Sequence, residues 1–192
     1  MIYHLYRDAF SEVYTYRYRL TDSNGKLILA ATWLPPGEGI QPPRIFFRDG
    51  KSRRVAHLDW ESRPWWQGDR FLLYLEGNET PILVIEEVWN MVDRLLLKMP
   101  RYRLRLPDGN VLEARGNRYS EHFYEIFVLP ADKGAWDEEE SGTWLGEVVH
   151  PPVGPTYILK TISPMLTQAP LLLVALVIVM DMWGLKAAND AF

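Results

Sequence analysis

A group of basic and aromatic residues is the part of this sequence whose residue types and spacing come closest to a ligand site. Its members are Arg48, Lys51, Arg53, Arg54, Trp65 and Trp66. Arginine forks match phosphate oxygens, and tryptophan favours the boundary between a membrane and water. The group therefore predicts a site for phosphate or a lipid headgroup. A solvated basic turn, with the tryptophans folded against the domain, is the alternative.

No group of residues in the sequence predicts catalysis. The four histidines are His4, His57, His122 and His150, which are too far apart to share one helix or hairpin. The neighbouring pair Glu86 and Glu87 would point to opposite faces of a strand. Nucleophile elbows, phosphate-binding loops and dinucleotide motifs are absent from the sequence. We therefore expect a protein that is not an enzyme and that uses no cofactor.

The acidic run Asp137–Glu140 is the one stretch that could attract a hard cation. It lacks the alternating ligand spacing and the central glycine of a calcium loop. We interpret it as part of a solvated loop, and we expect no metal site.

Charge and cysteine content narrow the partners and the compartment. The net charge of −4 argues against bulk nucleic-acid binding. Every arginine lies at or before Arg118, so an anion-binding face belongs to the first two thirds of the chain. The lack of cysteine fits a reducing compartment. The N-terminal residues do not read as a signal peptide. We expect a cytoplasmic protein, with peripheral membrane contact if the ligand is a lipid.

The stretch Ala169–Met180 contains no polar side chain and is followed by Asp181. A helix that is apolar all round belongs in a protein core or in a bilayer. Twelve residues span roughly 18 Å, which is short of a ~30 Å hydrocarbon layer. A longer span would bury the Asp181 carboxylate in lipid, at a cost of about 2.5–3.5 kcal/mol. A buried helix is the prediction, and a C-terminal membrane anchor that displays a β domain is the alternative.

This central helix is predicted over about residues 165–184. We expect its core side chains to include Leu172, Val174, Leu176 and Ile178. We expect Asp181 to end the buried run at the mouth of the fold, where water or a basic donor meets its carboxylate.

Strand signals fill residues 1–160. Residues 101–106 and 111–115 alternate around a Pro-Asp-Gly-Asn turn and predict a hairpin. The segment 86–98 combines helical spacing with β-branched residues, and we favour a strand there. About ten strands at regular spacing predict a sandwich or a barrel. Because only a closed barrel can surround an apolar helix, we predict an all-β barrel around a buried C-terminal helix, in one domain over 1–192.

Two stretches of this sequence resemble a known family. Residues 101–116, followed by 119–128, resemble the paired hairpins of LURP-one-related proteins and their bacterial relatives. Residues 157–160 and the apolar run ending in Asp181 resemble their C-terminal strand and helix. Phospholipid scramblases and the tubby C-terminal domain belong to the same superfamily. The proline-rich loop 35–43 and the acidic loop 132–140 depart from the family pattern, and the palmitoylated cysteines of scramblases have no counterpart here.

The resemblance implies a roughly twelve-stranded barrel wrapped on a central hydrophobic helix. It also implies a non-enzymatic, soluble binding protein that holds an anionic ligand, such as a phospholipid headgroup, or a protein partner.

Overall fold

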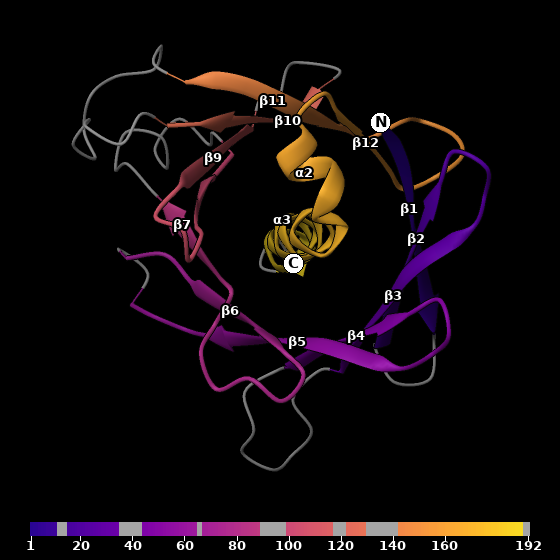
Figure 1. Cartoon of the computed structure of the whole chain (residues 1–192), viewed down its shortest axis with the longest axis horizontal. Coiled ribbons are helices and arrows are strands. Elements are labelled where there is room, and N and C mark those ends of the chain that lie inside the picture. The colour runs from indigo at the N-terminus through magenta and orange to yellow at the C-terminus, as the bar shows by residue number, and fades with distance from the viewer. Residues whose placement is uncertain are drawn as a thin grey trace.

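The computed structural model of this chain describes residues 1–10, 15–34, 44–64, 67–88, 99–116, 122–129 and 142–189. Twelve strands form one closed barrel (Figure 1). They are β1 (Ile2–Phe10), β2 (Thr15–Asp22), β3 (Leu27–Leu34), β4 (Arg44–Asp49), β5 (Arg54–Glu61), β6 (Arg70–Leu75), β7 (Leu83–Val88), β8 (Arg101–Arg105), β9 (Val111–Gly116), β10 (His122–Val128), β11 (Thr143–Val149) and β12 (Tyr157–Thr161).

Each strand pairs antiparallel with the next one in the chain, and β12 closes the barrel on β1. The register of this closing pair sets Tyr3 opposite Leu159 and Leu5 opposite Tyr157. All four of these side chains are buried. The predicted all-β closed barrel is therefore confirmed, and the count of twelve strands agrees with the resemblance.

Residues alternate between the inside and the outside of the barrel wall. In β4, Ile45 and Phe47 are buried inside while Arg44 and Arg48 are exposed outside. This period of two is the expected result of the β-strand backbone, in which successive side chains point to opposite faces. Functional side chains can therefore be assigned to the inner or the outer face from their place in a strand.

Helices α2 (Pro164–Gln168) and α3 (Pro170–Asn189) follow β12, and α3 lies along the centre of the barrel (Figure 1). The run from Leu172 to Met182 is buried throughout, with no side chain more than 9% exposed. The predicted core residues Leu172, Val174, Leu176 and Ile178 all belong to it. The enclosed apolar helix predicted from the sequence is confirmed, and it occupies the space that an internal ligand would need.

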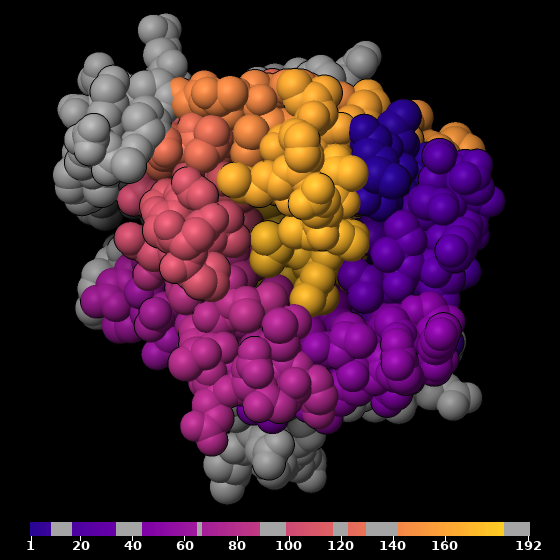
Figure 2. Space-filling model, in the orientation of Figure 1, coloured from indigo at the N-terminus to yellow at the C-terminus, as the bar shows by residue number. Residues whose placement is uncertain are grey.

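The two ends of the barrel differ. The turns that join β2 to β3, β4 to β5, β6 to β7 and β8 to β9 all lie at the end where β12 leads into α2, and we call it the turn end. In the space-filling view of Figure 2, the C-terminal helical segment, in yellow, fills the centre of the barrel mouth that faces the viewer. The other end, which we call the loop end, is the one that α3 approaches with its C-terminal half.

The structure bears on two predicted boundaries, the segment 86–98 and the end of the buried run at Asp181. Residues 86–88 belong to β7, as the preferred strand interpretation requires, whereas 89–98 lie outside the described residues. Asp181 does not end the buried run, because Met182 beyond it is also buried. Its carboxylate is 4% exposed and lies inside the wall, so its predicted position at the open mouth is corrected, whereas the predicted basic donor is present as Arg7, 2.6 Å away.

Candidate functional site: basic surfaces of the barrel

The basic turn between β4 and β5 is held by the side chain of Asp49. One oxygen of Asp49 accepts the backbone N–H groups of Lys51 and Arg53, each at 2.9 Å. Its other oxygen lies 2.7 Å from the Arg53 guanidinium. Hydrogen bonds from the backbone and side chain of Arg53, and from the backbone of Lys51, lower the pKa of Asp49. The turn is therefore a rigid support for the basic residues around it.

The basic side chains of this turn differ in their partners. Arg53 is 72% exposed although it pairs with Asp49. The Nε of Arg54 lies 2.8 Å from Glu76, and its guanidinium stacks over the ring of Phe46 at 4.1 Å. Arg48 donates to the carbonyl oxygen of Ser52 at 3.0 Å. Arg48, Lys51 and Arg53 are thus the most accessible cations of the group, while Arg54 is partly committed to packing.

The tryptophans of the predicted group, Trp65 and Trp66, lie outside the described residues. The described residues on either side of them, Pro64 and Gln67, follow β5 at the loop end. The eight residues of β5 separate that end from the basic turn by roughly 25 Å. Of the predicted site, the four basic residues are described, and the structure brings them together around the β4–β5 turn.

Most of the exposed large apolar side chains of the described residues lie at the same end as the basic turn, while Val153 is exposed at the loop end. Leu27 at the start of β3 and Leu75 at the end of β6 flank the β4–β5 hairpin, and both are exposed. Ile2 at the start of β1 and Ile162 after β12 belong to this end too, and Ile162 is 70% exposed. The turn end therefore combines exposed cations with exposed apolar groups.

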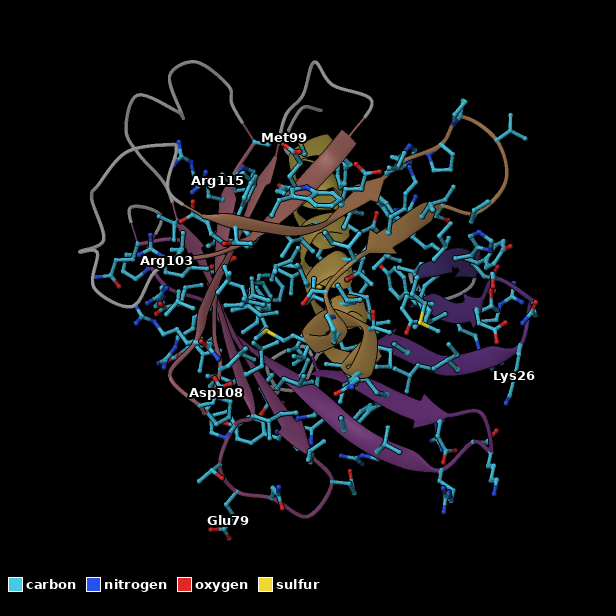
Figure 3. The ribbon with its side chains drawn as sticks, turned by 45° about the horizontal axis from the view of Figure 1, so that its top comes forward. Lys26, Glu79, Met99, Arg103, Asp108 and Arg115 are labelled. Atoms are coloured by element: carbon cyan, nitrogen blue, oxygen red, sulfur yellow. The ribbon has the colours of Figure 1, made fainter. Side chains whose placement is uncertain are left out.

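A second basic surface was missed by the sequence interpretation. We call it the arginine face; its members are Arg63, Arg70, Arg101, Arg103, Arg105 and Arg115. Five of them occupy outward positions of β6, β8 and β9, and Arg63 belongs to the loop between β5 and β6. Figure 3 shows Arg103 and Arg115 on the same side of the barrel. The alternation of Arg101, Arg103 and Arg105 is a sequence signal for this face, because alternate residues of a strand share one side.

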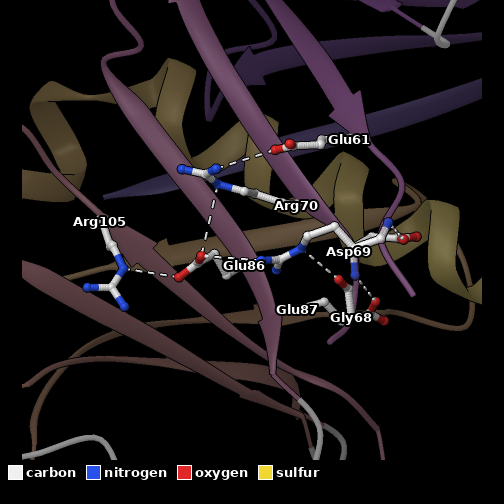
Figure 4. A network of polar contacts seen from close by, with 8 residues as sticks. Glu61, Gly68, Asp69, Arg70, Glu86, Glu87 and Arg105 are labelled. Carbon is white, nitrogen blue, oxygen red and sulfur yellow. Dashed lines mark hydrogen bonds and ion pairs between the residues drawn. The ribbon is translucent and has the colours of Figure 1, made fainter. Parts of the chain in front are cut away.

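Two glutamates organise the arginine face. Glu86 lies 3.0 Å from Arg105, 3.8 Å from Arg63 and 3.9 Å from Arg70 (Figure 4).

Glu113 plays the same part on β9. It lies 2.8 Å from Arg115, 3.2 Å from Arg103 and 4.0 Å from Arg101. Each carboxylate is thus shared by three guanidinium groups, which limits the freedom of the long arginine side chains.

A third polar cluster lies inside the barrel around Asp181. The carboxylate accepts a hydrogen bond from Arg7 at 2.6 Å, from Tyr18 at 2.8 Å and from Tyr157. Burial, followed by the nearby Asp181 charge, raises the pKa of Tyr18 and of Tyr157. Both phenols therefore remain protonated donors at neutral pH. This cluster binds α3 to β1, β2 and β12.

The described residues hold no group of three or more histidine, aspartate or glutamate side chains arranged to bind a metal ion. No helix within the described ranges has the length and apolarity needed to cross a membrane. Comparisons with protein-family models, curated proteins and solved structures find no match to this chain.

Proposed function

We propose that this chain is a non-enzymatic binding protein that attaches to anionic phospholipid surfaces through the turn end of its barrel. The observation that carries the proposal is the combination of exposed cations and exposed apolar side chains at this one end. The resemblance to LURP-one-related and scramblase-like proteins supports it, since lipid binding is among the activities of that superfamily. A cytoplasmic location with peripheral membrane contact follows from it.

The central helix directs binding to the outside of the barrel. Because α3 occupies the interior, a ligand has the outer wall and the two ends available. At the turn end, each basic residue near an anionic membrane contributes roughly 1 kcal/mol. Leu27, Leu75 and Ile162 would meet the lipid boundary beside these cations, which adds an apolar contribution to attachment.

Co-sedimentation with liposomes tests this proposal. We expect the wild type to pellet with vesicles that contain acidic phospholipid, and to be released as salt rises, because exposed charges are screened within ~8–10 Å. Replacing Lys51 and Arg53 by Ala should weaken binding roughly thirtyfold, if each contributes about 1 kcal/mol. Stability should change by less than about 0.5 kcal/mol, since both residues are exposed.

The matched control replaces Arg17 and Arg19 by Ala on the outer wall of β2. Each variant removes two positive charges. The two are also matched in their ion pairs, because Arg19 pairs with Asp8 much as Arg53 pairs with Asp49. We expect the control to bind like the wild type. Equal pelleting of all three proteins, or pelleting of none, contradicts the proposal.

A further inference from the structure

The arginine face differs in place and in composition from the turn end. The outward positions of β6 to β9 carry five arginines and two glutamates as their only charged residues. With Arg63, these six arginines and two glutamates leave an excess of four positive charges. The flanking Glu61 and Asp69, and Glu125 opposite Arg115 in the register of β9 and β10, reduce the excess to one, in a chain whose net charge is −4. This face therefore carries a small positive excess on an acidic protein.

The most accessible members of this face surround Glu86. Arg105 is 55% exposed and contacts Glu86 through its Nε. Arg70 is 37% exposed and lies between Glu86 and Glu61, at 3.9 and 3.4 Å. Figure 4 shows Glu86 between these two arginines. Three guanidinium groups on one carboxylate hold more N–H donors than its two oxygens can accept, so donor capacity remains for an incoming anion.

Preorganisation strengthens the case for recognition. An arginine that is already held by a carboxylate of its own protein loses less side-chain entropy when a ligand binds than a free one does. Arg103 lies between Glu86 and Glu113 in the strand register and is only 14% exposed. It pairs with Glu113 and so helps to hold that carboxylate in place. The face therefore presents cations in set positions.

The spacing of the arginines along β8 matches a ligand with an extended backbone. Arg101, Arg103 and Arg105 are alternate residues of one strand, so their Cα atoms repeat at about 6.8 Å. An extended peptide with carboxylates at alternate positions has the same repeat, and its first and third carboxylates would meet Arg101 and Arg105, since Arg103 is only 14% exposed. Because the barrel is closed, β8 already pairs with β7 and β9 and has no free backbone edge. Recognition would run through side chains alone.

We propose that the arginine face is a docking surface for an acidic, extended segment of a protein partner, with Asp or Glu at alternate positions. Guanidinium and carboxylate groups form paired, charge-assisted hydrogen bonds, which gives this chemistry both affinity and orientation. The surface belongs to the side wall of the barrel, so the proposal stands independently of lipid attachment at the turn end.

The test uses the full chain and a labelled peptide of six Glu-Ser repeats, with fluorescence anisotropy as the readout. We expect saturable binding at low salt that weakens as salt rises. Arg70→Gln combined with Arg105→Gln should weaken binding at least about fivefold. The matched control, Arg17→Gln with Arg19→Gln, removes the same charge from another wall and should stay within about twofold.

Three outcomes overturn the proposal. They are no binding of the acidic peptide by the wild type, equal losses in the two double variants, and tighter binding of a single-stranded oligonucleotide than of the peptide. The last would identify a nucleic-acid surface instead. A lysine-serine peptide, which should not bind, checks for non-specific attachment.

The two proposals can fail separately. The Arg70 and Arg105 variant should still pellet with acidic liposomes, and the Lys51 and Arg53 variant should still bind the acidic peptide. Urea unfolding of each variant checks that the barrel remains intact. If one variant abolishes both activities while its barrel stays folded, the assignment of two separate surfaces is wrong.

Discussion

The carboxylate of Asp181 is buried on an otherwise apolar stretch of α3, and side chains from three strands donate hydrogen bonds to it. Burying a carboxylate is costly unless it is paired and hydrogen-bonded. Arg7 supplies the opposite charge, and it is itself 29% exposed. Contacts between apolar side chains allow many rotations and depths of the helix inside the barrel, whereas a buried carboxylate keeps its hydrogen bonds in only one of them. Asp181 therefore contributes to the specific seating of the helix.

Substitutions in this pair give a prediction at the scale of single residues. Asp181→Leu should cost about 3 kcal/mol in the free energy of unfolding, near the low end for a broken buried pair because water reaches Arg7. Arg7→Met combined with Asp181→Leu should cost less than Asp181→Leu alone, since it leaves no uncompensated guanidinium. Urea unfolding of the wild type, both single variants and the double variant measures this. Strictly additive losses would show that the pair is not coupled.

At the scale of elements, α3 is the core of the barrel. Every side chain from Leu172 to Met180 is buried, and the inner residues of the strands pack around them. Without this helix, the inward apolar side chains of the strands would have no core to pack against. We therefore regard α3 as a folding element and not as an appendage.

A carboxylate placed in the middle of α3 should unfold the protein. Val174→Asp or Leu176→Asp introduces an unpaired charge at a site that is 1% exposed. The cost is several kcal/mol, against a typical total stability of about 5–15 kcal/mol. Ile162→Asp, at an exposed site just before α2, is the control and should stay soluble. Soluble expression and thermal melting report the result. A cooperative melt of Val174→Asp near the wild-type temperature would contradict the core role.

The helix and strands could be predicted from the local sequence, but the side-chain contacts between distant elements could not. The apolar run predicted the enclosed helix because its pattern is contained within a dozen residues. The partner of Asp181 is Arg7, which is 174 positions away, and no local pattern connects the two. Arg115 pairs with Glu113 from two positions away in the same strand, whereas the strand register brings Arg103 to both Glu86 and Glu113.

At the scale of the whole molecule, the ionisation of buried tyrosines opposes folding, and four of the five tyrosines buried among the described residues have the largest upward pKa shifts. Burial raises the pKa of Tyr18, Tyr102, Tyr124 and Tyr157 above the ordinary value near 10. Their phenols ionise near pH 10 in the unfolded chain but only at higher pH in the folded one. The stability that they contribute is fully present below pH 10 and is lost as the pH rises above it.

The stability of the barrel should therefore decline above about pH 10. Each buried tyrosine adds about 1.4 kcal/mol of loss per pH unit, so four could add about 5 kcal/mol per unit. Urea midpoints between pH 8 and 11 measure the decline. Tyrosinate absorbance gives a second readout, since the buried ones among the ten tyrosines should titrate only when the barrel opens. Smooth titration of all ten in a folded protein would contradict this assignment.

The order of elements along the chain has a consequence for biosynthesis. α3, which fills the centre, leaves the ribosome after all twelve strands that surround it. At ~5–20 residues per second, translation exposes the inner faces of these strands on the order of ten seconds before their filling is made. β1 must also wait for β12 before the wall can close. We therefore expect the nascent chain to pass through a stage in which apolar surfaces meet water and strand edges are unpaired, the kind of surface that chaperones protect.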